Sequence, residues 1–331
     1  MRLAPANSVK FQRDVPDQEA RSLKVLDLFC GAGGLASGFK KAGFNVTGVD
    51  ISEYAQDTFR FNHFGEFKLL DLSKEVMDGD YDAIIGGPPC RPWSNVNLTN
   101  RGKEHKDYQL VSVFFEHVER LKPRAFLFEN VFPVAHDDMF LAWIAKMEGL
   151  HYSVHKMRIR YSDYGAATTR GRFFAFGLAG GGDAAIFEKR LKRHKTGPRT
   201  VKHEIWSLRN KQLGEAPDHI WPQLNTIDSY KDRYESGQYG WYVLKWGEPA
   251  PSFGNVMKTY ILHPESFNGG TTRVISVRES YRIMGFDSRF RFPRDNGMGK
   301  RYQMVVDSVS PIFSKKAAKV IKQLLSEDVK N

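Results

Sequence analysis

Short apolar runs alternate with amphipathic stretches through the first half of the chain. Runs of β-branched and other apolar residues at 23–29, 45–50 and 81–85 predict buried strands. Between them, residues 35–42 and 54–61 place apolar side chains at helical spacing. Strands that alternate with helices in this way favour an α/β fold built on a doubly wound, mostly parallel sheet.

The same pattern continues to about residue 180. Residues 110–121 carry apolar side chains at helical spacing and are followed by Pro123, which predicts the end of that helix. The run 125–128 predicts another buried strand, and residues 153–161 and 173–177 predict an antiparallel pair.

The composition changes beyond residue 180. Three consecutive glycines lead into a basic run at 189–195, and eight tryptophans and tyrosines are scattered between residues 206 and 246. Basic residues interleaved with aromatic ones suit contact with nucleic acid, although any irregular small domain can contain them. The hydrophobic periodicity here is too weak to predict helices or strands, and we expect a second, irregular domain.

Charge and cysteine content restrict the functional class. The formal net charge of +11 favours a polyanionic partner. The two cysteines, Cys30 and Cys90, exclude a disulfide framework and have no metal-binding spacing, so we expect a reducing compartment and no metal. There is no apolar run long enough to span a bilayer and no apolar signal core near the N-terminus. We therefore expect no membrane association and a cytoplasmic location.

A glycine-rich turn at residues 30–34 joins the first strand to the first helix. This geometry lets a cofactor approach the backbone at a helix N-terminus, although many strand–helix turns need small residues only for packing. Asp50 ends the next strand, where nucleotide-type cofactors have their ribose hydroxyls bound. Asp71 follows a third strand and either accepts from an adenine amino group or caps a loop. Asp27 and Asp50 suit cationic S-adenosylmethionine better than a phosphate.

The segment Gly86-Gly87-Pro88-Pro89-Cys90 directly follows a predicted strand. Ligands of open α/β sheets bind beyond the carboxyl ends of the strands, so a thiol on this stiff turn is a candidate nucleophile. The alternative is a cysteine that only packs. Glu129 ends the neighbouring predicted strand, and two reactive groups at adjacent strand ends favour an active site over a helix cap.

Cationic residues form two further candidate sites. Arg170 and Arg172 project to one side of an extended segment, either as a surface charge pair or as a clamp for an anion or a carbonyl oxygen. Residues 95–106 are polar and basic, which indicates either a solvated loop or a mobile lid that closes over a phosphate backbone.

In their order along the chain, these motifs resemble those of the cytosine-C5 DNA methyltransferases of bacterial restriction–modification systems. The matching segments are residues 27–34, Asp50, Asp71, Pro89-Cys90 with Ser94, Glu129-Asn130-Val131, Arg170-Gly171-Arg172, and Arg273 through Gly285-Phe286. Two segments depart from the family pattern. Ala167-Thr168 stands where the family usually has Pro and Gln, and residues 306–310 read Val-Asp-Ser-Val-Ser instead of Gly-Asn-Ser/Ala-Val-Pro.

The resemblance implies the S-adenosylmethionine-dependent methyltransferase fold with a smaller, irregular target-recognition domain. Residues 1–184 would form the catalytic and cofactor-binding domain, and residues 185–270 the target-recognition domain. Residues 271–302 would form the hinge and closing motif of the recognition region, and residues 303–331 a C-terminal helix that returns to the catalytic domain.

The resemblance also implies residue roles. Cys90 would attack C6 of a flipped cytosine, Glu129 would hold N3 and the exocyclic amine, and Arg172 would bind O2, with Arg170 in the same catalytic set. S-adenosylmethionine would give S-adenosylhomocysteine on a site formed by Phe29, Gly31, Gly33, Asp50, Ile51, Asp71, Leu72, Pro89 and Ser308. The expected DNA contacts are Arg91, Ser94, Arg101, Lys103, Lys189, Arg190, Lys192 and Arg193.

The implied partner is double-stranded DNA, bound by a monomer, with a separate cognate restriction endonuclease as a further partner. A tRNA cytosine-C5 methyltransferase of the same fold and a non-catalytic DNA-binding relative are the alternatives. The sequence does not identify the base that removes the C5 proton.

Overall fold

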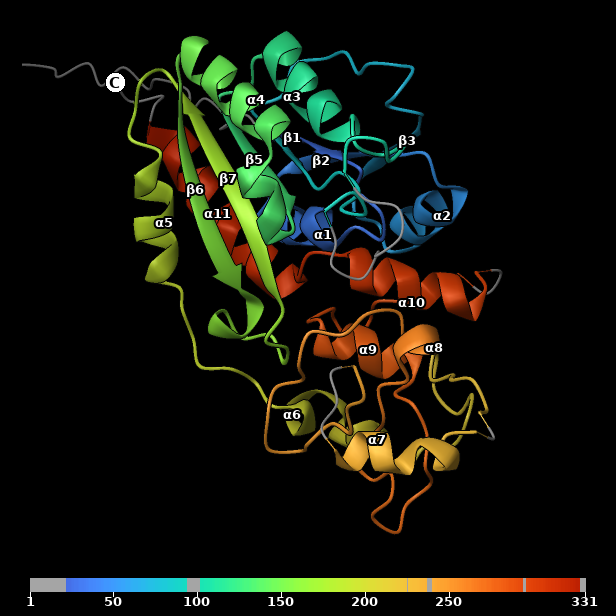
Figure 1. The fold of residues 1–331 in the computed structure, drawn as a ribbon. Helices are drawn as coiled ribbons and strands as arrows, with labels where there is room; N and C mark the ends of the chain where they lie inside the picture. Colours follow the sequence, from blue (N-terminus) through green and yellow to red (C-terminus); the bar gives the residue numbers. More distant parts are fainter. Residues whose placement is uncertain (1–21, 94–101, 225, 237–239, 294–295, 328–331) are drawn as a thin grey trace, which may run out of the picture.

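A seven-stranded mixed sheet forms the centre of the larger lobe (Figure 1). The computed structural model describes residues 22–93, 102–224, 226–236, 240–293 and 296–327. Across the sheet the strands lie in the order β3-β2-β1-β4-β5-β7-β6. Their bounds are β1 Lys24–Leu28, β2 Asn45–Asp50, β3 Glu66–Leu69, β4 Ala83–Gly86, β5 Ala125–Asn130, β6 Tyr152–Arg160 and β7 Gly171–Ala179.

The first five strands are parallel, and β7 pairs antiparallel with both β5 and β6. The mostly parallel, doubly wound sheet expected from the sequence is confirmed. The chain winds outward from β1 to β3 in one direction and from β4 to β6 in the other. The carboxyl ends of β1 and β4 therefore form the switch point at which ligands bind in open α/β sheets.

Helices cover both faces of this sheet because successive strand side chains point to opposite sides. On one side, Val25 of β1 belongs to the same core as Phe39 of α1 (Gly34–Lys41) and Phe313 of α11 (Pro311–Glu327). On the other, the next residue, Leu26, belongs to the core of α3 (Leu110–Leu121) and α4 (Asp138–Gly149). Helix α2 spans Glu53–Phe61.

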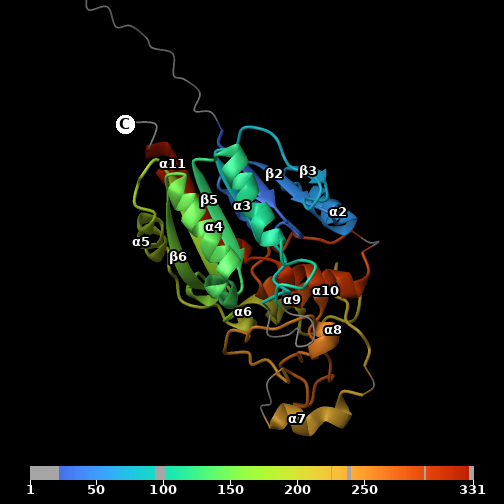
Figure 2. The ribbon, with the colours of Figure 1, turned by 45° about the horizontal axis from the view of Figure 1, so that its top comes forward.

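The smaller lobe has little regular structure, as the weak periodicity predicts. Its helices are α6 Val201–Ile205, α7 Lys231–Glu235, α8 Val256–Thr259 and α9 Val277–Ile283. Helix α10 (Met298–Asp307) lies between this lobe and the sheet in both views (Figures 1 and 2). No described helix combines the length and apolar character needed to cross a bilayer.

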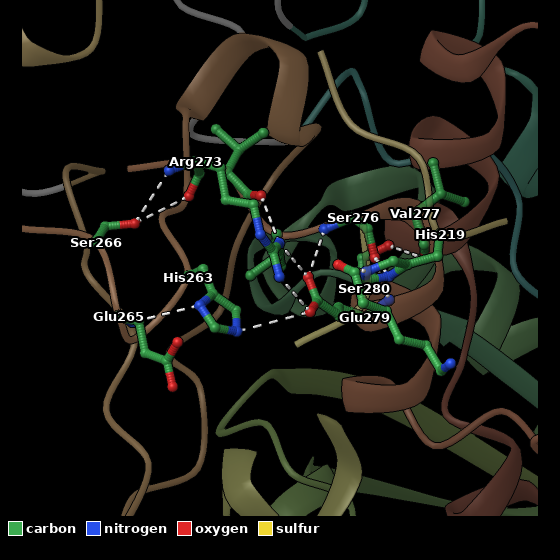
Figure 3. A network of polar contacts seen from close by, with 12 residues as sticks. His219, His263, Glu265, Ser266, Arg273, Ser276, Val277, Glu279 and Ser280 are labelled. Atoms are coloured by element: carbon green, nitrogen blue, oxygen red, sulfur yellow. Dashed lines mark hydrogen bonds and ion pairs between the residues drawn. The ribbon is translucent and has the colours of Figure 1, made fainter. Parts of the chain in front are cut away.

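A buried ion pair organises the smaller lobe (Figure 3). Arg273 donates to both carboxylate oxygens of Glu279 at 2.7 and 2.8 Å, and Glu279 is fully buried. Ser276 and Glu279 form a capping box at the start of α9. Burial alone would raise the pKa of Glu279, but the hydrogen bond and charge of Arg273 lower it. A carboxylate that is both ion-paired and capping fixes where α9 begins.

Helix α5 (Ala185–Lys192) belongs by its contacts to the sheet, because it packs on α11 and β6. The sequence-based boundary would place it in the recognition domain, residues 185–270. The division at residue 184 remains a prediction, and this packing favours a boundary later in the chain. Helix α11 packs along α1, as a C-terminal helix returning to the catalytic lobe would.

Candidate active site

The loop after β4 carries Cys90 at the switch point of the sheet. A Cβ on Gly86 would lie 2.4 Å from the carbonyl oxygen of Leu28 in β1, so only glycine lets the two strands end this close together. Asn130, at the end of β5, donates from Nδ2 to the carbonyl of Pro88 at 3.1 Å. The Cys90 carbonyl accepts from the Trp93 amide at 3.0 Å. The thiol is thus held by contacts from a neighbouring strand and from its own turn.

Glu129 and Arg172 meet beside this loop. Glu129 of β5 is 8% exposed, and its Oε1 lies 3.1 Å from Nε of Arg172 in β7. A Cβ on Gly87 would approach Oε2 of Glu129 to 2.5 Å. The side chain of Glu129 therefore lies directly against the backbone of the Cys90 loop, and the sequence-predicted residues Cys90, Glu129 and Arg172 lie together.

These groups shift one another's pKa values. Burial raises the pKa of the Cys90 thiol to about 11, against the opposing charge of Arg172, and the carboxylates of Glu129 and Asp307 raise it further. Burial also raises the pKa of Glu129 to about 7, although Arg172 acts to lower it. Near neutral pH the site therefore holds a protonated thiol beside a carboxyl group that is half protonated.

Arg170 has a different environment from Arg172. Its guanidinium is buried and donates to two backbone carbonyls, that of Phe253 at 3.2 Å and that of Val306 at the end of α10. Arg170 thus ties the start of β7 to the smaller lobe and to α10. Its assignment to the catalytic set remains a prediction, and these contacts support a positioning role.

The glycine turn after β1 lies against the end of β2. Asp50 accepts from the amide of Gly31 at 3.0 Å through Oδ2 and from that of Ser52 at 2.9 Å through Oδ1. Each carboxylate oxygen has a further lone pair available for a ligand hydroxyl. Ile51 is 66% exposed, an unusual state for a large apolar side chain next to a buried strand. Phe29 has φ of 58°, a strained conformation typical of functional sites.

The start of α1 lies very close to the segment that follows α10. A Cβ on Gly34 would lie 2.3 Å from the carbonyl oxygen of Val309 and 3.1 Å from Cβ of Ser308. Gly33, which precedes α1, has φ of 79°, a left-handed conformation that favours glycine. The segment after α10 thus crosses the start of α1, which brings Ser308 to the glycine turn. Its contact with the cofactor remains a prediction.

The surroundings of Asp27 show whether this region suits a cationic cofactor. Its Oδ2 accepts from the amide of Ala36 at 3.0 Å, but its buried Oδ1 has no hydrogen-bond partner. Burial raises the pKa of Asp27 well above its ordinary value, and Asp50 raises it further. An unpaired buried oxygen beside a second carboxylate fits a ligand that carries positive charge.

Asp71 and Leu72 follow β3. The Asp71 carboxylate accepts from the hydroxyl of Ser73 at 2.6 Å and pairs with Lys74 at 3.1 Å. Both contacts are local, and the predicted contact of Asp71 with adenine remains a prediction. Leu72 is buried in the core on the α3 side of the sheet.

The residues expected to contact DNA lie in separate parts of the structure. Arg91 and Lys103 are exposed close to the Cys90 loop, and Lys103 lies 3.5 Å from Asp138. Lys189, Arg190, Lys192 and Arg193 lie on or next to α5, where Arg190 pairs with Glu327 at 2.7 Å. Ser94, Arg101 and most of the expected lid lie outside the described residues. Among the described residues, no cluster of His, Cys, Asp and Glu could hold a metal ion.

One group in the site was not assigned a role from the sequence. Asp307 ends α10, and its carboxylate is close enough to raise the pKa of both Cys90 and Glu129. In the sequence, a role for Asp307 is indicated by its place in residues 306–310, the motif that departs from the family pattern.

Comparison with known proteins agrees with this geometry. The family model described as C-5 cytosine-specific DNA methylase matches residues 23–323. The type II methyltransferase M.FnuDI of Fusobacterium nucleatum is 28% identical over 348 residues, covering 93% of this chain and 96% of that protein. M.NgoPII of Neisseria gonorrhoeae is also 28% identical, covering 92% and 96%.

Solved structures share the fold. A methyltransferase encoded within an E. coli prophage has a TM-score of 0.71 at 23% identity, covering 92% of this chain and 100% of that one. Dnmt2 methyltransferase of S. pombe has a TM-score of 0.69 at 15% identity, covering 93% and 100%. Because the family match includes every strand of the sheet and all the residues just placed at its edge, this chain belongs to the C-5 cytosine-specific DNA methylases and is a DNA cytosine-C5 methyltransferase.

Proposed function

We propose that Cys90 forms a transient bond to C6 of a cytosine in duplex DNA, which lets C5 accept the methyl group that S-adenosylmethionine would supply. The observation that carries this proposal is the meeting of the Cys90 loop with the Glu129–Arg172 pair, whose Nε–Oε1 distance is 3.1 Å. A thiolate, an acid and a fixed cation are the groups needed to activate an electron-poor pyrimidine ring.

The pKa values suggest how the addition proceeds. Carbon 5 is a poor nucleophile until a bond at C6 breaks the aromaticity of the ring. Cys90 supplies that bond once its thiol has lost a proton. Glu129, with a pKa of about 7, is protonated often enough to donate to N3 as the sulfur adds. Arg172 would bind O2 and stabilise the charge that develops on the ring.

The residues around the glycine turn would hold the cofactor. Asp50 would accept from the ribose hydroxyls, Ile51 would cover the adenine ring, and Asp27 would face the positively charged methionine part. When bound, S-adenosylmethionine supplies an electrophilic methyl group, which the cytosine ring can accept at C5 once Cys90 has added at C6. The backbone of the turn and of Ser308 would fix the cofactor beside the Cys90 loop.

A cytosine stacked in duplex DNA cannot reach a thiol at the edge of the sheet, so we infer that the target base is flipped out. Arg91 and Lys103, exposed near Cys90, would contact the phosphates of the opened strand. Since the named bacterial relatives are type II methyltransferases, we further propose that the protein is the modification enzyme of a restriction–modification system in the cytoplasm.

Duplex DNA with 5-fluorocytosine at the target tests the covalent step. Bisulfite sequencing of DNA from expressing cells first gives the methylated site. With S-adenosylmethionine present, the protein should then become attached to the fluorinated duplex, because fluorine at C5 blocks elimination of the cysteine.

The Cys90→Ala variant should form no adduct and should lose methyl transfer by about 10³-fold or more, yet it should still bind DNA. Adduct formation by Cys90→Ala at the wild-type rate would contradict the assignment. Absence of an adduct with the wild-type protein would contradict the mechanism.

A further inference from the structure

The reaction requires a base for the C5 proton, and the roles proposed for Cys90, Glu129 and Arg172 do not supply one. Among the groups near Cys90, Asp307 is an ionisable residue without an assigned role. By its accessible surface Asp307 is an exposed residue, whereas its neighbours Val306 and Ser308 are buried. Solvent therefore reaches the residue, although the protein packed around its carboxylate disfavours the charged form.

Two close contacts place Asp307 between the two halves of the site. On one side, the carbonyl of Val306 accepts from Arg170, two residues from the Arg172 that pairs with Glu129. On the other side, Ser308 lies against Gly34 at the start of α1, where the glycine turn ends. Asp307 therefore lies where the groups for the target base and those for the methyl donor come together.

A chain of amide hydrogen bonds fixes the Asp307 side chain. Asn255 caps α8 by accepting from the Met257 amide at 3.1 Å, so its Nδ2 is free to donate to Oε1 of Gln303 at 3.1 Å. The amide nitrogen of Gln303 then donates to both carboxylate oxygens of Asp307 at 2.9 Å. The direction of each bond follows from the one before it, and Asp307 can only accept.

Burial and the neighbouring charges act in opposite directions on the pKa of Asp307, which is raised overall. Burial raises its pKa, whereas the hydrogen bond from Gln303 and the charges of Arg91 and Arg172 lower it. In return, Asp307 raises the pKa values of Cys90, Glu129 and Asp50. The carboxylate thus interacts with the groups on both sides of the site.

We propose that the Asp307 carboxylate is the base that removes the proton from C5 after methylation, directly or through one water molecule. In this step the C5–H bond breaks and its electron pair forms the C5–C6 double bond. The C6–S bond breaks with its pair remaining on the Cys90 sulfur, and the proton passes to Asp307. The proposal rests on the covalent mechanism above.

The Asp307→Asn variant separates elimination from the earlier steps. It introduces the Asn that the family pattern has at this position, keeps the shape of the side chain and cannot take up the proton, so it tests whether this chain depends on its own carboxylate. On ordinary target DNA, turnover should fall by about 100-fold or more, the usual contribution of a general base, and the methylated covalent complex should accumulate in denaturing gels. With 5-fluorocytosine DNA and S-adenosylmethionine, which need no C5 base, adduct formation should stay within about threefold of the wild-type rate.

Two further variants complete the test. Asp78→Asn removes an exposed carboxylate that pairs with Arg120, and it should leave both assays unchanged. Gln303→Glu replaces the donor by a like charge, which should raise the pKa of Asp307 and move the acid limb of the turnover profile to higher pH. An unmoved acid limb in a folded Gln303→Glu protein would contradict the proposal.

Wild-type turnover by Asp307→Asn would also refute it, and equal losses in trapping and turnover would show that Asp307 acts before elimination. If the wild-type protein forms no fluorocytosine adduct, the covalent mechanism itself fails. These outcomes distinguish the two proposals.

Discussion

The proposed addition needs Cys90 deprotonated and Glu129 protonated at the same time. In the proposed mechanism the thiol, with a pKa of about 11, must lose a proton to attack, and Glu129, with a pKa of about 7, must keep one to donate. Burial is the largest cause of both shifts, because a low-dielectric site disfavours each charged form. The reacting form of the site is therefore a minor population near neutral pH.

This pairing predicts an unusual pH profile for adduct formation on 5-fluorocytosine DNA. Below pH 7, Glu129 is protonated and the thiolate fraction rises about tenfold per pH unit, so the rate should rise with pH. Above pH 7, deprotonation of Glu129 offsets the continuing gain in thiolate, and the rate should level off. Rapid-quench measurements from pH 5.5 to 9 test this.

In Glu129→Gln the offset is lost, so the slower rate should continue to rise above pH 7. DNA binding should weaken far less than methyl transfer. If the rate still levels off above pH 7 in Glu129→Gln, a group other than Glu129 causes the plateau. Equal losses in DNA binding and methyl transfer would indicate a structural role for Glu129.

At the scale of elements, the site depends on how closely β4 and β5 end together. The hydrogen bond from Asn130 to Pro88 and the contact of Gly87 with Glu129 join the end of one strand to the loop of the other. Both contacts involve the backbone of the Cys90 loop, so the loop and the carboxylate are positioned as one unit. A small displacement of either group would separate the acid from the nucleophile.

Gly87→Ala tests this unit. Its added Cβ would lie 2.5 Å from Oε2 of Glu129, whose Oε1 pairs with Arg172. A shift of the carboxylate that relieves this contact should therefore disturb the ion pair. Methyl transfer should fall by about 100-fold, in line with the loss from a misplacement of about 1 Å, while the melting temperature changes little. Gly149→Ala in α4, where an added Cβ meets nothing within 4 Å, should have full activity. An active Gly87→Ala protein would show that the contact is dispensable.

At the scale of the whole molecule, the described cations that are expected to contact DNA lie in two regions that the sequence does not distinguish. Arg91 and Lys103 are exposed near the active-site loop, whereas the basic run at 189–195 begins on α5, beside α11 and β6. Figure 1 shows α5 beyond the β6 edge of the sheet. On this arrangement, we expect DNA that reaches Cys90 to contact the first region.

The salt dependence of DNA binding tests the two regions separately. Each phosphate contact contributes roughly 0.9 to the slope of log affinity against log salt, because a counterion is released. Arg91→Ala should reduce the slope by about 0.9, and Lys192→Ala with Arg193→Ala should leave it unchanged. A reduction of about 1.8 in the double variant would instead support the DNA contacts expected from the sequence for α5.

The sequence by itself determined much of the catalytic lobe. Apolar runs predicted where the strands lie. The predicted bounds 45–50 and 110–121 coincide with β2 and α3, because local hydrophobic periodicity is strong there. The motif order placed Cys90 after one strand, Glu129 at the end of the next and Arg172 just before a third. The carboxyl ends of the parallel strands β4 and β5 meet at one edge of the sheet, and antiparallel β7 brings its amino end to the same edge.

Only the tertiary structure decided the rest. In the smaller lobe, order comes from long-range contacts such as the Arg273–Glu279 pair, which leave no periodic pattern in the sequence. The surroundings of Arg170, α5 and Asp307 depend on segments distant in the chain, since Arg170 binds the carbonyls of Phe253 and Val306. A residue's type sets the chemistry it can perform, but the groups packed around it set its charge and its partners.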